Sequence, residues 1–204
     1  MVQVSPVTKF HSGAGYQYED SVIYGFTHTN KGHWNLCHIP LLPVTGTPTP
    51  GDYCSPFSHE RESAAPGYYQ VFLDRYGVDA QLSSTLRCAF HKYTYPAGAA
   101  ASLLADLQRS NEHVRAWDIR KEGDNVFAGW QQTGEKMYFY AVANRPVTGI
   151  EPVVEGDREV RIVRFGEGDG ALELRIGFSF VSEKNARENL AVSYTHLTLP
   201  TTER

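Results

Sequence analysis

Residues 55–69, which read SPFSHERESAAPGYY, are the stretch that decides the fold and the site. The stretch holds one histidine and two glutamates, His59, Glu60 and Glu62, between prolines and a glycine that restrict the backbone. The residues that follow, Tyr68–Leu73, have the composition of a β-strand. A polar loop that leads directly onto a strand is a usual place for a rigid scaffold to display functional groups.

Downstream of this stretch, short strand patterns recur with turn residues between them and without long helical periods. We expect hairpin turns at residues 74–77, 122–124 and 167–170. The pattern predicts an all-β fold, an antiparallel β-sandwich. The expected strands are Tyr68–Leu73 and residues 78–82, 85–95, 102–107, 114–120, 125–130, 137–143, 159–165 and 171–181.

The two ends of the chain differ from this pattern. Upstream, a polar loop at residues 29–35 precedes an expected apolar strand at residues 36–44. Downstream, Ser182 is a candidate N-cap and Glu183 lies in the first turn of a short helix. Two tryptophans inside strand patterns, Trp117 and Trp130, are expected to lie in the core.

Composition limits the class of protein. The 204 residues fit one domain, and a net charge of -4 with interspersed signs gives no electrostatic case for nucleic acid. No apolar run approaches the roughly 18 residues that a membrane span needs. Three cysteines without a C-x-x-C spacing argue against a structural zinc site and allow one bridge plus a free thiol. An aromatic content of 12% suits a packed core and also sugar binding.

Several segments together resemble glycoside hydrolase family 92. The opening stretch matches a family motif, and it is followed in order by LSST at residues 82–85 and by Arg87-Cys88 and HKYTYP at residues 91–96. YGFTH at residues 24–28 with Cys37, MYFY at residues 137–140, and two blocks between residues 177 and 190 match other parts. The similarity is colinear from residue 1 to about residue 190, and it implies a β-sandwich of the supersandwich type.

The resemblance implies that the chain is a piece of a larger enzyme. Family members are calcium-dependent, inverting exo-α-mannosidases that act on α-mannoside glycans such as N-glycans or mannans, and they are secreted or periplasmic. Their acid, base and most calcium ligands lie in an (α/α)6 barrel that follows the sandwich. We therefore expect residues 1–190 to be the N-terminal domain, truncated at its start and without a signal peptide. Residues 191–204 resemble a non-native adaptor-like tail.

The expected site contains no catalytic residue and no metal ligand from this chain, and calcium is expected only in the full-length enzyme. Trp34, in a polar loop, is the best candidate for a platform under a sugar ring. Its loop departs from the family's Gly-rich block, so the preferred mannoside linkage does not carry over. His59 could contact a sugar or the barrel, or it could bond backbone carbonyls of its own loop. The expected substrate-binding residues are His28, Asn30, His33, Trp34, His59 and Glu60.

Two patterns suggest other chemistry. If Glu60 and Glu62 shared a strand face, their side chains would lie roughly 6–7 Å apart, near the separation of an acid and base pair in inverting glycosidases. Their proline-containing loop and Arg61 favour a structural role instead. His28, His33 and His38 form a possible metal cluster on paper, but their spacing of five residues fits neither a helix face nor a strand face.

The sequence therefore predicts the N-terminal β-sandwich of an α-mannosidase, which packs on the catalytic barrel and lends loops to the sugar site. We expect this chain alone to be inactive and to expose an apolar patch where the barrel would lie. The alternative is a stand-alone carbohydrate-binding β-sandwich. A histidine-dependent metalloprotein is a third hypothesis.

Overall fold

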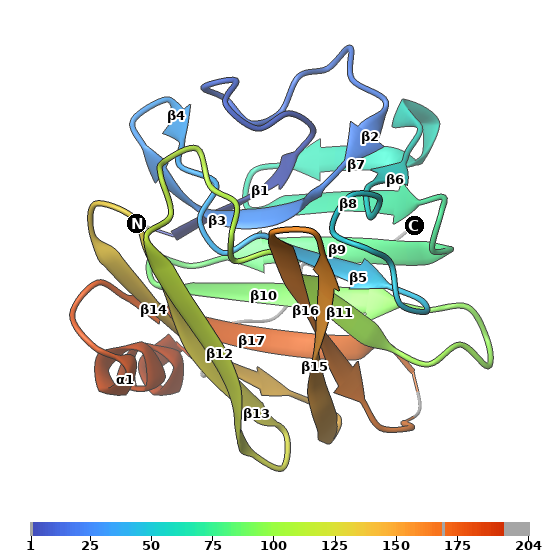
Figure 1. Cartoon of the computed structure of the whole chain (residues 1–204). Coiled ribbons are helices and arrows are strands. Elements are labelled where there is room, and N and C mark those ends of the chain that lie inside the picture. The colour runs from blue at the N-terminus through green and yellow to red at the C-terminus, as the bar shows by residue number, and fades with distance from the viewer. Residues whose placement is uncertain (1, 169, 194–204) are drawn as a thin grey trace.

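Alternating apolar and polar residues build two antiparallel β-sheets that pack face to face (Figure 1). The computed structural model describes residues 2–168 and 170–193. The two sheets form the layers of an all-β antiparallel sandwich, so the predicted fold class is confirmed.

Strands that are neighbours in a sheet are not always neighbours along the chain. In spatial order, the first sheet consists of β1 (Val2–Val7), β3 (Gly25–Lys31), β5 (Leu41–Val44), β11 (Ser102–Ala105), β16 (Arg158–Phe165) and β15 (Val147–Glu155), with β4 (Trp34–Asn35) paired to β3. The second consists of β12 (Ala116–Gly123), β13 (Val126–Gln132), β14 (Lys136–Ala143), β17 (Leu172–Ser179), β10 (Cys88–Thr94), β9 (Val78–Ser84), β8 (Tyr68–Leu73) and β7 (Glu62–Ala65). The remaining elements are the β2 (Val22–Ile23) and β6 (Ser55–Pro56) pair, the 3-10 helix η1 (His59–Arg61) and α1 (Glu183–Ser193).

The core lies between the two sheets. On β14, Met137 and Phe139 are buried while Tyr138 and Tyr140 face outward, which is the alternation expected of a strand. The rings of Phe139 and of Phe127 on β13 pack edge to face, with centroids 6.3 Å apart. Such pairs fill the space between the layers and fix the register of neighbouring strands.

The predicted strand at residues 36–44 is wrong in its first half. The structure begins β5 only at Leu41, because Cys37 and Ile39 have φ angles of 54° and 53°. These angles lie in the left-handed region, which is incompatible with a strand. The apolar run is therefore a sharply bent segment followed by a short buried strand.

Two edge strands do not stand out in the sequence. β15 forms the edge of the first sheet even though it contains Gly149 and Pro152, which weaken its strand pattern. Proline is tolerated there because an edge strand has one side without ladder hydrogen bonds. β7 covers residues expected to be a loop, and its sequence ESAA has little β propensity.

Two further expectations change. The hairpin expected around residues 167–170 does not form, because β16 and β17 belong to different sheets. Trp117 packs half-buried against the core, but Trp130 is not part of it. Trp130 alternates with the buried Gly129 and Gln131, so its ring lies on the outer face, where the Lys136 ammonium sits 3.5 Å from the ring centroid.

The three cysteines are free thiols, so the bridge left open by the sequence does not form in this structure. Cys37 is buried, and burial raises the pKa of its thiol to about 12. A buried thiol of this kind behaves as a small apolar side chain.

The helix α1 packs on the outer face of the second sheet, against β17 and β14 (Figure 1). Its start is as predicted, because the Ser182 hydroxyl accepts the backbone N–H of Asn185 at 3.1 Å. Residues 191–193, expected to belong to the tail, form the end of α1, and residues 194–204 lie outside the described part of the chain. No helix in the described part is long and apolar enough to cross a membrane.

Close packing of α1 depends on Gly177 of β17. A Cβ atom at this position would lie 2.2 Å from the backbone oxygen of Ala186 and 2.9 Å from the Cβ of Leu190. We predict that Gly177→Ala lowers the free energy of unfolding by about 1–3 kcal/mol, because the helix must move away. Chemical denaturation followed by circular dichroism measures the change.

The matched control is Gly149→Ala in β15, where a Cβ would meet no atom within 4 Å. We expect this variant to change stability by less than about 1 kcal/mol. Equal effects of the two substitutions would contradict the packing explanation.

Candidate functional site

The candidate loops gather along one side of the sandwich, at the top of Figure 1. The turn between β3 and β4 lies at one end, and the segment from β6 to β7 lies at the other. The chain between β1 and β2 runs between them (Figure 1). It contacts both, since a Cβ on Gly13 would lie 3.3 Å from the Trp34 ring and Tyr18 stacks on His59.

The structure divides the predicted binding residues into three places. His33 and Trp34 lie in the exposed β3–β4 turn with ring centroids 5.3 Å apart, and Trp34 is 56% exposed. His59 and the exposed Glu60 lie in η1. His28, on β3, is fully buried. Their roles in sugar binding stay predictions.

Asn30, at the end of β3, has an unusual side-chain environment. Its Oδ1 atom is buried and has no hydrogen-bond partner among the described residues. A buried polar atom without a partner costs about 1–3 kcal/mol, so such atoms are rare in native proteins.

The segment that follows β4 is strained. Ile39 is β-branched, and its φ of 53° is a genuine outlier for such a residue. Specific bonds hold it there: the Gln131 side-chain oxygen accepts the Ile39 N–H at 2.9 Å, and the Asn35 oxygen accepts the Cys37 N–H at 2.8 Å. Each such residue costs on the order of 1–3 kcal/mol, and strain of this kind clusters at functional sites.

A directional chain of hydrogen bonds fixes this segment from inside the core. His28 Nδ1 lies 2.9 Å from the carbonyl oxygen of Ile39, which can only accept, so His28 donates there. Its Nε2 atom then accepts from Nε2–H of His91 at 3.2 Å. The Nδ1 atom of His91 accepts in turn from the Tyr93 hydroxyl at 2.6 Å. Both rings are neutral in this arrangement, and burial lowers the pKa of each, that of His28 to about 4.

The three histidines of the possible metal cluster do not meet. His28 is bound to His91, and His33 is exposed in its turn. His38 lies between the Thr29 hydroxyl at 2.8 Å and a carboxylate oxygen of Glu112 at 2.8 Å. In the described ranges no group of three or more His, Cys, Asp or Glu side chains is placed to hold a metal.

Glu62 organises the opening stretch, although the sequence pattern predicts no binding role for it. Its carboxylate accepts hydrogen bonds from the hydroxyls of Tyr16 at 3.0 Å and Tyr69 at 2.6 Å, and from His59 Nδ1 at 2.5 Å. It lies on β7 while Glu60 lies in η1, so the two glutamates do not share a strand face. Arg61 pairs with Asp74 instead of either glutamate. The signal that could have found this hub is the tyrosine pair that opens β8, because Tyr69 lies opposite Ala64, two residues along β7 from Glu62.

His59 carries two protons in this structure. Its Nε2 atom lies 2.8 Å from the carbonyl oxygen of Tyr18 and its Nδ1 atom faces the Glu62 carboxylate, so both nitrogens must donate. The bond to Glu62 accordingly raises the pKa of His59. The ring therefore bonds a backbone carbonyl of another segment, the chain between β1 and β2, and not one of its own loop.

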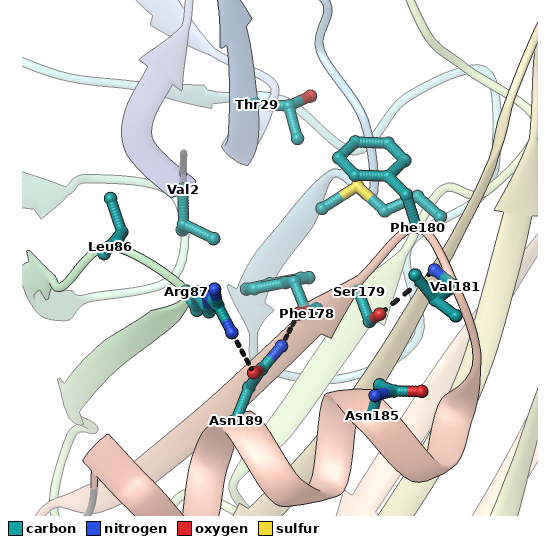
Figure 2. Close-up of a pocket in the computed structure, with 11 residues that line it drawn as sticks. Val2, Thr29, Leu86, Arg87, Phe178, Ser179, Phe180, Val181, Asn185 and Asn189 are labelled. Carbon is teal, nitrogen blue, oxygen red and sulfur yellow. Dashed lines mark hydrogen bonds between the residues drawn. The ribbon is translucent and has the colours of Figure 1, made fainter.

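An apolar groove of about 330 Å³ lies between the start of β1 and the start of α1 (Figure 2). Figure 2 shows its floor held together by Asn189, which accepts from Arg87 and donates to the carbonyl oxygen of Phe178. Its rim exposes Phe180 by 47% and Val181 by 77%. Leu86 on the opposite side is 61% exposed. Several large apolar side chains exposed next to one another are unusual on a protein surface.

The chain matches a known family over most of its length. Residues 1–190 match the sequence model of the glycosyl hydrolase family 92 N-terminal domain. No curated protein sequence matches the chain. The fold is similar to that of the GH92 α-mannosidase BT3965 from Bacteroides thetaiotaomicron, with a TM-score of 0.85 and 24% identity over 97% of this chain and 32% of that one.

Two other solved structures are similar. The GH92 family glycosyl hydrolase ccman5 gives a TM-score of 0.80 and 26% identity, over 97% of this chain and 31% of that one. The inverting GH92 mannosidase BT2199 from Bacteroides thetaiotaomicron VPI-5482 gives 0.80 and 22%, over 97% and 29%. This chain thus spans about a third of the length of these structures.

The fold and the match define a β-sandwich domain of a glycoside hydrolase. The chain belongs to glycosyl hydrolase family 92, and residues 1–190 correspond to the N-terminal domain of that family.

The histidine chain makes stability sensitive to acid. Because the folded pKa of His28 lies near 4, below the unfolded value of about 6.5, the unfolded chain binds the extra proton. The contribution of His28 to stability is full above pH 6.5 and is lost as the pH falls toward 4, by about 3 kcal/mol. Urea unfolding at pH values between 7 and 4 measures the loss.

We expect His91→Gln to flatten this pH dependence, because the variant removes one of the two buried rings. His33→Gln is the control, since His33 is exposed and should leave the slope as it is. A wild-type slope no steeper than that of the His91 variant would show that the pair is not responsible.

Proposed function

We propose that this chain is the non-catalytic domain of an exo-acting α-mannosidase, that it docks on the catalytic remainder, and that it completes the sugar site with its β3–β4 loop. The observation that carries the proposal is the family match over residues 1–190 in a chain that spans about a third of its structural relatives. The strained β3–β4 region and the apolar groove supply the two surfaces that such a role needs.

The groove is the proposed docking face for the remainder of the polypeptide. Leu86, Phe180 and Val181 expose apolar area to water next to the groove formed between β1 and α1. Covering such area stabilises an assembly by roughly 25 cal/mol per Å². The rim also carries Arg87 and Asn185, which offer polar groups at the border of a contact.

The β3–β4 loop is the proposed contribution to the sugar site. Trp34 presents an exposed indole that can cover the apolar face of a pyranose ring. Nearby on the same hairpin, Asn30 holds the buried acceptor without a partner among the described residues. The strained segment at residues 37–39 fixes the base of the hairpin, which reduces the entropy lost when a ligand binds.

Catalysis requires groups beyond this chain. Inverting glycosidases use two carboxyl groups roughly 6.5–9.5 Å apart with a water between one of them and the sugar. Glu62 is bound by three donors and held in place, and Glu60 is exposed in a surface turn. We therefore infer that the isolated chain does not hydrolyse α-mannosides.

The family resemblance implies calcium and export. In the part of the chain that the structure describes, no group of three or more His, Cys, Asp or Glu side chains is placed to hold a metal ion. We infer that the residues that hold calcium lie in the remainder of the enzyme, and that the enzyme is secreted or periplasmic. α-Mannoside glycans such as N-glycans or mannans are the proposed substrates.

A stand-alone carbohydrate-binding module is the second candidate, favoured by the exposed aromatic rings Trp34 and Tyr18. The two candidates differ in their need for the rest of the polypeptide. Addition of the separately produced remainder should restore mannose release if this chain is a domain of an enzyme. A stand-alone module would bind sugar, but its addition would not restore mannose release.

The first test is in the complete enzyme. We predict that Trp34→Ala lowers kcat/KM for an α-mannobioside by about 5- to 150-fold, which corresponds to the loss of about 1–3 kcal/mol of aromatic contact with the sugar. Trp130→Ala, which removes a ring from the outer sheet face, is the matched control and should have little effect. Equal activity of wild type and Trp34→Ala would show that the β3–β4 loop is not part of the sugar site.

The second test concerns the groove. We expect the isolated chain to self-associate at high concentration and Val181→Asp to abolish this, because the charge is placed in the apolar rim. Val154→Asp on β15, a site 63% exposed, is the control. Sedimentation velocity over a concentration series measures association. A chain that stays monomeric throughout, or a control as effective as Val181→Asp, would contradict the assignment of the groove.

A further inference from the structure

A second cavity lies beside the opening stretch, away from the β3–β4 turn. It has a volume of about 590 Å³ and lies between β1, the loop that follows it, and the β7–β8 hairpin. Val4, Pro6 and Ala64 form apolar parts of its wall, and Tyr16, Tyr18 and Tyr69 supply aromatic rings. Its volume falls within the range of small-molecule sites, and its lining contains none of the β3–β4 turn residues.

Tyr18 forms a rigid aromatic platform in this wall. Its ring is 64% exposed and lies parallel to the His59 ring, with centroids 4.1 Å apart and planes 6° apart. The His59 ring also packs against Phe57, edge to face at 5.2 Å. Because His59 donates to the carbonyl oxygen of Tyr18 as well, the exposed ring is fixed at both its face and its backbone. A fixed, exposed aromatic face can pack against the apolar face of a sugar ring.

The polar groups of the cavity can bond neutral hydroxyls. Tyr16 and Tyr69 use their protons on Glu62, so each phenolic oxygen keeps a lone pair that can accept. Ser5 accepts from Asn35 at 3.2 Å and so keeps its own proton to donate. Ser63, also on the wall, is exposed and adds a hydroxyl. The wall therefore offers both acceptors and donors next to its apolar residues.

The charge of the cavity excludes an anionic ligand. Among the described residues that line it there is no lysine or arginine. Its one cation, His59, is neutralised by Glu62 and has both N–H groups engaged. A carboxylate or phosphate would find no free cationic partner and would face Glu62.

We propose that this cavity is a second sugar site, which binds a single neutral pyranose of a glycan against Tyr18. The ligand class rests on the proposed function, whereas the location rests on the cavity alone. The tyrosine and serine hydroxyls hold the hydroxyls of the ring, and the apolar wall packs on its opposite face. A glycan held at this cavity and at the β3–β4 loop would contact the domain twice.

The test uses the purified 204-residue chain with methyl α-D-mannopyranoside and methyl α-D-glucopyranoside, followed by saturation-transfer NMR and calorimetry. We expect weak, saturable binding with millimolar Kd of at least one of the two sugars. Tyr18→Ala should weaken it at least tenfold, and Tyr18→Phe should retain it, because the platform and the backbone carbonyl remain. D-glucuronate should not compete, since the site has no free cation.

Trp34→Ala is the matched control, an exposed aromatic ring in the other loop, and should leave this binding unchanged. Binding lost in Trp34→Ala and kept in Tyr18→Ala would place the sugar at the β3–β4 loop, which overturns the second site and leaves the proposed function standing. Absence of saturable binding of both sugars would also overturn the site. The docking and activity tests above are independent of either result.

Discussion

The hydrogen bond between His28 and His91 joins the two sheets in the interior of the sandwich. His28 belongs to β3 in the first sheet and His91 to β10 in the second. Neither ring reaches solvent, and each has both nitrogens bonded, so the pair is satisfied without carrying charge. Apolar packing is tolerant of small shifts, but this bond sets how β3 and β10 lie across the layer.

The loop that we assign to the sugar site depends on this interior bond. The chain Tyr93, His91, His28 ends on the carbonyl oxygen of Ile39, the residue with the strained backbone. Gln131 holds the N–H of the same residue from the neighbouring sheet. Partners from both sheets therefore hold the strained backbone in place. The free energy that the strain costs is offset by the stability of the rest of the fold.

The sequence predicts strands such as β9 and β14 because buried and partly exposed residues alternate along them. The regions that it misses have specific physical causes: two left-handed residues interrupt the run at residues 36–44, and β15 tolerates proline because it lies at an edge. The site is harder to predict. Composition identifies His59 as a candidate binding residue. It does not reveal that the His59 ring donates to Glu62, because the tyrosines that complete this hydrogen-bond network lie on other segments. Long-range polar pairing of this kind is set by the tertiary structure.

The edges of both sheets are unsuited to pairing with another chain. β1 and β15 each contain a proline, which lacks the N–H that an added strand would need. β7 has only four residues and is followed by Pro66, and β12 carries charged side chains of both signs at residues 118–122. These features disfavour growth of either sheet by the addition of a strand from another chain. The self-association proposed for the groove would then involve side-chain surfaces and would not extend either sheet.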